Sequence, residues 1–420
     1  DPVMRLRITL ALIVLALIAS ERVHRTKVAL LGAAIVVLFV GQYNEELAIE
    51  SVEFATLGLL AGMMILVYLT QQSGVYDYIA VKAGQLSRGR PFLLVVMLVT
   101  TVAVMSGFLD NLTTILLIVP ITFLLADTLD INPMPLILIE VMAANIGGAA
   151  TLIGDPPNIM IGNSANLSFN DFLINNMPGV VVILATVTVG LYFAYRSQLQ
   201  VAEENRKYVQ ELDAAASIRD HDELRRTLPV LIGTIILFFL HQYIHVEPAT
   251  IALTGAAVGL MVTKTPIEEA LEKIEWTTLF FFIGLFVMVG ALEVTGAIEK
   301  LAEGITSVTN GNRDAELVGI IWTSSLVGGI VDNIPLTAAM IPVVEDIKAG
   351  STDHAYWWAL SLGACFGGNL TLISAACNVA ASGMAEKAGR PIGFWTFLKV
   401  GFPVTVASTV MATAYVLLRF

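Results

Sequence analysis

The chain has 420 residues, of which 56% are hydrophobic and 14% are charged, and its mean hydropathy is +0.78. Soluble domains carry roughly 25% charged residues, so this composition excludes a soluble globular protein. It indicates an integral membrane protein, and the lipid bilayer is therefore one of its predicted partners. A formal net charge of −12 without a basic stripe excludes nucleic acid as a partner.

Apolar runs of about 17 to 25 residues, the length that crosses a bilayer as a helix, recur from end to end. The first run, residues 4–20, resembles a signal peptide, because two arginines precede an apolar core. A matching segment later in the chain favours a first membrane helix instead. A second run carries Asp110 and Asn111 in its middle, and a third is interrupted by the sequence IGDPPN at 153–158. The long polar segment at 196–226 mixes both charge signs and predicts an amphipathic cytoplasmic linker.

The second half of the chain repeats the first. GFLDNLTTILLIVP matches GIVDNIPLTAAMIP, which places Asp110 and Asp332 222 positions apart. NIGGAATLIGDPPN, which begins at Asn145, matches CFGGNLTLISAACN, which begins at Cys365, at an offset of 220. Such repeats with broken helices at matching positions are typical of secondary transporters. The predicted units are a first repeat at 4–195, a linker at 196–228 and a second repeat at 229–420.

Positive charge predicts the topology, because lysine and arginine mark the cytoplasmic side. ERVHRTK, KAGQLSRGR and the linker can all be cytoplasmic only if the segment between Phe92 and Pro120 dips into the membrane and returns. We therefore predict an all-α polytopic membrane protein with two inverted repeats of about five transmembrane helices, each with a re-entrant hairpin and a broken helix. The first hairpin enters from the cytoplasm, the second, with Asp332 and Asn333 at its tip, enters from outside, and both termini lie outside.

The run IGDPPN explains where a solute could bind. A broken helix is tolerated in a membrane only inside the protein or along a water-filled cavity. Two consecutive prolines free the carbonyls between Thr151 and Gly154, and the next half-helix begins with exposed N–H groups. Carbonyls favour cations and the helix start favours anions, so the break suits either. The second break offers Ser374 and Cys377 where the first offers Asp155, so the predicted site is asymmetric.

Four acids inside membrane segments are candidates for proton or ion coupling, because acids there are rare and costly. Asp110 and Asp332 have an alternative role as helix N-caps. A capping role is less favoured for Asp155, because the neighbouring prolines already break its helix. Glu140 has no acidic counterpart, because the matching position in the second repeat is Leu360. The alternative to a coupling role is that Glu140 lies near the lipid headgroups. An acid buried away from water can take up and release a proton during transport.

Amides and hydroxyls repeated in both halves can bind a neutral polyhydroxy solute, coordinate sodium or hold an oxyanion. Cys377 is either a thiolate ligand for a soft metalloid or a small buried hydrophobic residue. One thiol cannot chelate, and Cys365 is about three helical turns away, so neither a metal site nor a cofactor is predicted. The predicted substrate-binding set is Asn111, Thr113, Thr114, Thr151, Gly154, Asn158, Asn333, Thr337, Thr371, Ser374, Cys377 and Asn378.

GFLDNLTTILLIVP and NIGGAATLIGDPPNIMIG resemble the ArsB/P-protein branch of the ion transporter superfamily, and the resemblance runs over nearly the whole chain. The branch includes arsenical pump membrane proteins and is more distantly related to NhaD antiporters and dicarboxylate carriers. The resemblance implies a scaffold domain, an elevator-like transport domain and a solute among the two tips and two breaks. It implies a prokaryotic plasma membrane and, as partners, a homodimer and the separate ATPase subunit of some arsenical pumps. In such a moving transport domain, six glycines would allow close packing of helices, namely Gly107, Gly147, Gly148, Gly329, Gly367 and Gly368.

The leading hypothesis is export of arsenite and antimonite in exchange for protons, with the uncharged trihydroxide held by amides, hydroxyls and backbone groups. The alternative is a sodium/proton antiporter or a sodium-coupled anion transporter that uses the same loops. The serine-asparagine-threonine tip of carboxylate carriers is replaced here by aspartate-asparagine, which disfavours a dicarboxylate. A channel is disfavoured by the broken repeats, and an enzyme by the lack of a catalytic constellation or a GxxxxGK[ST] loop.

Overall fold

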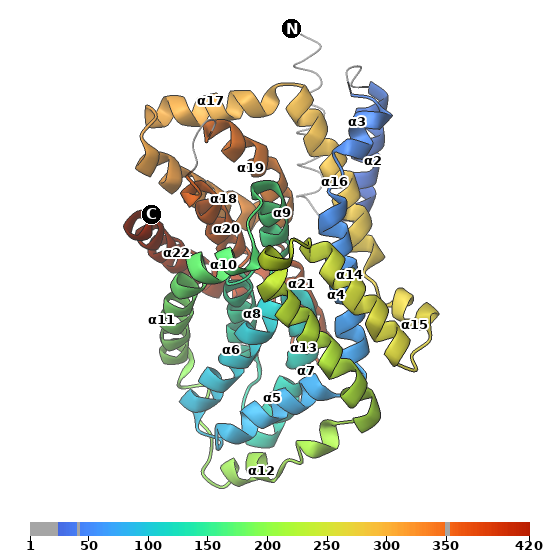
Figure 1. Ribbon diagram of the computed structural model, residues 1–420. Coiled ribbons are helices and arrows are strands. Elements are labelled where there is room, and N and C mark those ends of the chain that lie inside the picture. The colour runs from blue at the N-terminus through green and yellow to red at the C-terminus, as the bar shows by residue number, and fades with distance from the viewer. Residues whose placement is uncertain (1–23, 40–42, 349–352) are drawn as a thin grey trace.

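The computed structural model describes residues 24–39, 43–348 and 353–420, and within these ranges the chain is helical and has no strands (Figure 1). Eight of the described helices are long and apolar enough to cross a membrane, namely α4, α6, α7, α11, α13, α16, α18 and α22. The apolar run at 4–20, predicted to be the first membrane helix, lies outside the described residues.

The first half of the described chain contains ten helices. They are α2 (Arg25–Phe39), α3 (Glu45–Glu50), α4 (Phe54–Gln71), α5 (Val75–Leu86), α6 (Pro91–Phe108), α7 (Asn111–Leu129), α8 (Met134–Gly148), α9 (Pro156–Ala165), α10 (Phe169–Asn175) and α11 (Met177–Tyr195).

The second half contains another ten helices. They are α13 (His221–Ile244), α14 (Pro248–Val262), α15 (Ile267–Glu272), α16 (Trp276–Val294), α17 (Ala297–Thr309), α18 (Arg313–Val331), α19 (Asn333–Ile347), α20 (Ala355–Gly367), α21 (Ala376–Lys387) and α22 (Phe394–Arg419).

In two helix pairs, a helix of the first half packs along a helix of the second half, and we call these the exchanged pairs. Helix α2 packs along α16, and α4 packs along α14, so each pair joins one helix from each half. The hairpins follow the same rule, since α7 contacts α21 and α19 contacts α9. Helices α5 and α17, which match in sequence, lie near opposite ends of the molecule (Figure 1). This is the placement that an inverted pair of repeats would have.

Up to Asp220 the linker contains only short helices, α12 (Arg206–Glu211) and the 3₁₀ turn η1 (Ala215–Ser217), and it is tied to the first half. Nδ2 of Asn205 donates to the carbonyl of Leu129 at 3.3 Å, and the backbone N–H of Arg219 donates to the carbonyl of Ser73 at 2.9 Å. Helix α13 begins at His221, ahead of the predicted boundary at 229, because the Asp220 carboxylate accepts from the first free N–H groups of that helix.

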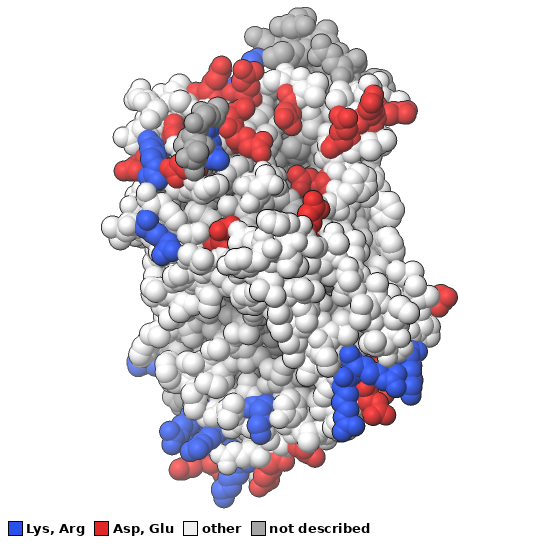
Figure 2. All heavy atoms as spheres, in the orientation of Figure 1, with Lys and Arg blue, Asp and Glu red and all other residues white. Residues whose placement is uncertain are grey.

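Charged side chains separate along the long axis of the molecule. Figure 2 shows lysine and arginine gathered at the end that carries α12 and the linker, and mostly acidic side chains at the opposite end. A broad uncharged band lies between the two ends (Figure 2). Long apolar side chains such as Val182, Phe193 and Leu418 are exposed on α11 and α22, as expected for helices that face hydrocarbon.

Candidate functional site

Each hairpin turns at the predicted aspartate-asparagine pair. Helix α6 ends at Phe108 and α7 begins at Asn111, and Oδ1 of Asp110 accepts a hydrogen bond from the N–H of Thr113 at 2.8 Å. In the second hairpin, Oδ1 of Asp332 accepts from the N–H of Ile334 at 2.9 Å. Both aspartates therefore cap the second arm of their hairpin, which was the alternative role predicted for them.

The two helix breaks separate α8 from α9 and α20 from α21, at the places predicted. Each break is held by an asparagine at the start of the second half-helix. Nδ2 of Asn158 lies 2.8 Å from the carbonyl of Thr151, and Nδ2 of Asn378 lies 2.9 Å from the carbonyl of Thr371. These amides satisfy carbonyls that a continuous helix would have paired, so they stabilise the broken conformation.

Threonine hydroxyls connect each break to its hairpin. The hydroxyl of Thr151 donates to the carbonyl of Gly107, and that of Thr371 donates to the carbonyl of Gly329 at 2.7 Å. The two pairs occupy matching positions in the repeats. Each hairpin tip and its break thus form one unit whose polar contacts are repeated in both halves.

A third asparagine, Asn145, joins the halves and was not among the predicted site residues. Its Oδ1 accepts from Nδ2 of Asn111 at 3.1 Å, while its Nδ2 lies 2.9 Å from Oδ1 of Asn369 and 3.1 Å from Oδ1 of Asn378. Asn145, Asn369 and Asn378 are completely buried. The network places the first tip and the second break in one cluster at the centre of the protein.

Asp155 lies at this centre and is 1% exposed. Its Oδ1 lies 3.4 Å from Nδ2 of Asn111, and its Oδ2 has no hydrogen-bond partner among the described residues. It makes no side-chain cap to α9. A buried carboxylate oxygen without a partner is costly unless it binds a proton, a cation or a solute group.

The two cysteines lie beside different asparagines. The Cys377 thiol lies 3.1 Å from Oδ1 of Asn145, and the Cys365 thiol lies 3.5 Å from Oδ1 of Asn158. Asp155 interacts with both thiols. Cys377 therefore belongs to the network around Asn145, whereas Cys365 lies beside Asn158 at the first break, and Asp155 is the group that both thiols share.

Asp332 differs from Asp110 in having a basic partner. Nη1 of Arg25 lies 2.7 Å from Oδ2 of Asp332, and the Arg25 guanidinium also lies over the ring of Phe281, 5.0 Å from its centroid. Asp332 has a φ of +135°, a region that a residue other than glycine enters only at a cost. The ion pair and the cap to Ile334 together hold this strained tip.

Glu140 lies inside the protein, 1% exposed, and not at an exposed surface near the headgroups. Helix α8 is enclosed by α6, α7 and α11, which removes Glu140 from water. The hydroxyl of Thr122 donates to Oε1 of Glu140 at 2.6 Å, and Oε2 has no partner among the described residues. The structure places this acid against α7 and shows no hydrogen bond from it to the asparagine cluster.

The remaining predicted residues divide into two groups. The hydroxyl of Ser374 donates to the carbonyls of Gly368 and Thr371, both at 2.8 Å, so it supports the second break. The N–H of Gly154 donates to Oγ1 of Thr151 at 3.1 Å, which fixes the first break. The hydroxyl of Thr337 donates to the carbonyl of Asn333 in its own helix at 2.7 Å. In two of these remaining predicted residues a buried polar atom has no partner among the described residues, namely Oγ1 of Thr114 and Nδ2 of Asn333.

Glycines permit close helix contacts at the breaks, with one exception. A side-chain carbon at Gly147 would lie 2.5 Å from the Cα of Ala103, and one at Gly367 would lie 2.7 Å from the carbonyl of Ser325. Gly148 and Gly329 are similarly confined, and Gly368 is less so, with its nearest atom at 3.1 Å. Gly107 differs, since a carbon there would meet its nearest atom only at 3.5 Å, an ordinary contact. The expectation of close packing therefore fails at Gly107.

Two polar cavities border the first hairpin and helix α9. One, of about 450 Å³, is lined by Thr113 beside the first tip and by Tyr68, Arg219 and Glu275. The other, of about 220 Å³, is lined by Ser164 of α9 and by three glutamates, Glu53, Glu293 and Glu345. A third polar cavity, of about 740 Å³, also borders α9, at Gly162 and Asn163.

Comparison with known sequences places the chain in a family. A family model described as citrate transporter matches residues 15–363. An uncharacterized transporter of Mycobacterium tuberculosis is 41% identical over 98% of both chains, and a 46 kDa membrane protein of Mycobacterium leprae is 40% identical over 98% of both chains. The P protein of Homo sapiens is 35% identical over 96% of this chain and 58% of its own length. This supports the P-protein half of the predicted resemblance, while the arsenical pump half stays a prediction.

Two solved structures share the fold. The YdaH transporter of Alcanivorax borkumensis superposes with a TM-score of 0.58 at 14% identity, over 88% of this chain and 86% of its own. MtrF of Neisseria gonorrhoeae, described as illuminating a class of antimetabolite efflux pumps, gives a TM-score of 0.57 at 13% identity, over 87% and 81%. From its sequence match and its apolar helices, this chain is an integral membrane protein that belongs to the citrate transporter family.

Proposed function

We propose that the protein is a secondary active transporter that exports arsenite and antimonite across a prokaryotic plasma membrane in exchange for protons. The observation that carries this proposal is the position of Asp155, whose free Oδ2 lies in a buried cluster of amides and two thiols. A carboxylate that can exchange one proton and a set of neutral ligands for a small hydroxylated solute are the two parts that such an exchange requires.

The charges of the cluster support a neutral solute. Asp155 interacts electrostatically with both Asp110 and Asp332, and Arg25 is held by Asp332. A multivalent carboxylate such as citrate would be repelled by these acids, whereas an uncharged trihydroxide would not. Its hydroxyl groups can donate to amide and carboxylate oxygens and accept from amide N–H groups.

The thiols support a soft solute. Sulfur ligands are preferred by soft metals and metalloids, and Asp155 interacts with two buried thiols, Cys365 and Cys377. In the sequence interpretation a single thiol gave this hypothesis little support. The second thiol makes the cluster better suited to arsenite or antimonite than to sodium, which prefers oxygen ligands.

The packing supports movement of the hairpins and breaks against the exchanged helix pairs. Helices α2, α4, α14 and α16 would form the scaffold, and the two hairpins with the two broken helices would move past it. The basic end that carries the linker would be cytoplasmic, because lysine and arginine gather there (Figure 2). Both termini would then lie outside, as the sequence predicts.

The alternative function is a sodium/proton antiporter or a sodium-coupled anion transporter. One observation favours the anion carrier. Arg25 and His24 line a cavity of about 420 Å³ beside Ala375 and Ala376, where the second half-helix begins. A cation beside a helix N-terminus suits an anion.

The test is uptake into respiring everted membrane vesicles, with arsenite, antimonite, sodium, chloride and citrate supplied in separate experiments. We expect accumulation of arsenite and antimonite that collapses when a protonophore removes the proton gradient. A Cys365→Ser/Cys377→Ser variant should lose most metalloid uptake. Proton movement on addition of sodium, without arsenite uptake, would instead identify an antiporter, and accumulation of citrate or chloride would identify an anion carrier.

A further inference from the structure

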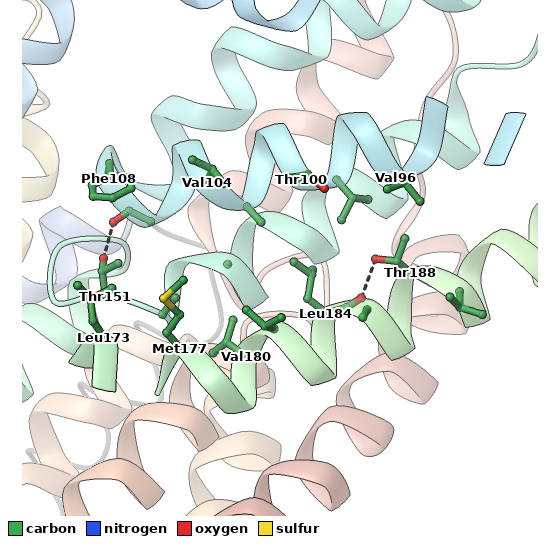
Figure 3. Close-up of a pocket in the computed structure, with 18 residues that line it drawn as sticks. Val96, Thr100, Val104, Phe108, Thr151, Leu173, Met177, Val180, Leu184 and Thr188 are labelled. Carbon is green, nitrogen blue, oxygen red and sulfur yellow. Dashed lines mark hydrogen bonds between the residues drawn. The ribbon is translucent and has the colours of Figure 1, made fainter. Parts of the chain in front are cut away.

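A groove of about 380 Å³ runs between α6 and α11 and ends at the first helix break (Figure 3). Four residues at its mouth, Val104, Met177, Val181 and Val189, are 42% to 55% exposed. Both α6 and α11 have the length and composition of membrane spans. The mouth is therefore continuous with the surface that faces the bilayer, and it opens on hydrocarbon instead of water.

The groove offers almost nothing to a polar ligand. No charged residue lines it, and its polar side chains are three threonines. The hydroxyl of Thr188 donates to the carbonyl of Leu184 at 2.6 Å, and that of Thr151 donates to the carbonyl of Gly107 (Figure 3). These two hydroxyls are satisfied within the protein. The lining is thus suited to an apolar occupant.

The other repeat fills the matching space with its own side chains. At the offset of 220, Ala150 in the groove corresponds to Leu370. Leu370 packs so tightly on Gly329 that a side chain at position 329 would overlap with Leu370. At the offset of 225, Met177 corresponds to Phe402. Leu370 thus occupies the space against Gly329 that Ala150 leaves open beside Gly107, where the nearest atom to an added carbon lies at 3.5 Å.

The second repeat also joins the matching helices directly. The hydroxyls of Ser325 on α18 and Thr409 on α22 lie 2.6 Å apart. The corresponding residues are Ala103 on α6 and Leu184 on α11, which line the groove and cannot make this bond. Helices α6 and α11 accordingly make fewer contacts with each other than α18 and α22 make.

We propose that this groove binds one acyl chain of a membrane phospholipid. Its wall on α6 runs from Val96 to Phe108, a separation of 12 residues. At about 1.5 Å per residue this is about 18 Å, close to the roughly 15 Å that one leaflet contributes to the hydrocarbon core. A single chain of ordinary length can fill the groove from its mouth to Thr151. The lipid then packs beneath the Thr151–Gly107 contact and supports the first break from the membrane side.

The proposal can be tested by reconstituting the full-length chain in vesicles of phosphatidylcholine that carries a diazirine near the middle of one acyl chain. After illumination, cross-linked peptides are mapped by mass spectrometry. We expect adducts on groove residues such as Ala150 and Leu184, in addition to adducts on Val182, which is exposed on α11 but does not line the groove. Adducts on Val182 without any in the groove would overturn the proposal.

Two variants fill the groove by different routes. Ala150→Leu introduces the side chain that the second repeat uses, and Ala185→Phe blocks the groove from its exposed side. Both should abolish the groove adducts and leave the Val182 adducts unchanged. Thr186→Phe, on the neighbouring exposed position outside the groove, is the matched control and should change neither. Groove adducts that persist in Ala185→Phe, or cross-links from the groove to a second copy of the chain, would contradict the proposal.

Discussion

Nη1 of Arg25 lies 2.7 Å from Oδ2 of Asp332, and this ion pair connects α2 to the tip of the second hairpin. Helix α2 packs on α16, so the contact joins the exchanged helices to the hairpin. The first hairpin has no equivalent, because Pro248 occupies the repeat position that corresponds to Arg25 at an offset of 223. Asp110 instead interacts with Glu275, an acid. The two tips thus differ in charge and also in backbone conformation, since Asp110 is extended (φ −177°) whereas Asp332 has a φ of +135°.

Replacing Arg25 with glutamine should destabilise the protein, because it leaves a buried carboxylate without its cation. Arg25 is 23% exposed, so we expect a loss between the values for exposed and buried pairs, about 1 to 3 kcal/mol. Thermal unfolding in detergent measures it. Asp332→Asn in the same background should recover part of the loss, since it removes the unpaired charge. An unchanged unfolding temperature in Arg25→Gln would show that the pair contributes no stability.

Gly147→Ala tests the close contact between α6 and α8. A side-chain carbon at Gly147 would lie 2.5 Å from the Cα of Ala103, a backbone atom that cannot move without its helix. We expect a loss of about 1 to 3 kcal/mol in unfolding free energy and impaired solute uptake. The control is Gly190→Ala on α11, where no atom lies within 4 Å of the added carbon. The control should unfold at the wild-type temperature or slightly above it, and equal behaviour of the two variants would refute the contact.

The two thiols should react slowly with a membrane-impermeant maleimide. Cys365 and Cys377 are completely buried, so a reagent reaches them only when the hairpins and breaks move. Glu203→Cys on the exposed linker, in a Cys365→Ser/Cys377→Ser background, gives the rate for an open site. Labelling of the native thiols at that open-site rate would show that they are accessible in the resting protein. Acceleration by an imposed proton gradient is the expected sign of transport.

The sequence was a good guide wherever a residue acts on the backbone nearest to it. The aspartate-asparagine tips and the proline break fall at the predicted positions, because capping and the loss of N–H donors are local effects. Predictions that needed distances across the fold were less successful. The sequence did not indicate that Cys365 lies beside Asn158 of the other half, or Cys377 beside Asn145, because both contacts cross between the repeats.

Asn145 and Asn369 show what repeat matching could not find. They match Cys365 and Ala149, respectively, so neither has a polar amide at its repeat position. Nδ2 of Asn145 lies 2.9 Å from Oδ1 of Asn369, and this contact joins the two halves, so it depends on the tertiary arrangement. A search for isolated amides in apolar helices, without regard to the repeat, would have selected both. Arg25 could be found only from the structure, because a basic residue near a helix start also fits a role in topology.

The most direct test of proton-coupled transport is Asp155→Asn in proteoliposomes with an imposed proton gradient. Asparagine keeps the shape of the buried side chain but cannot exchange the proton, whereas Asp127→Asn on the exposed face of α7 is the matched control. We predict that Asp155→Asn still binds arsenite but neither accumulates it nor moves protons, and that Asp127→Asn does both at wild-type rates. Undiminished gradient-driven accumulation in Asp155→Asn would contradict the account.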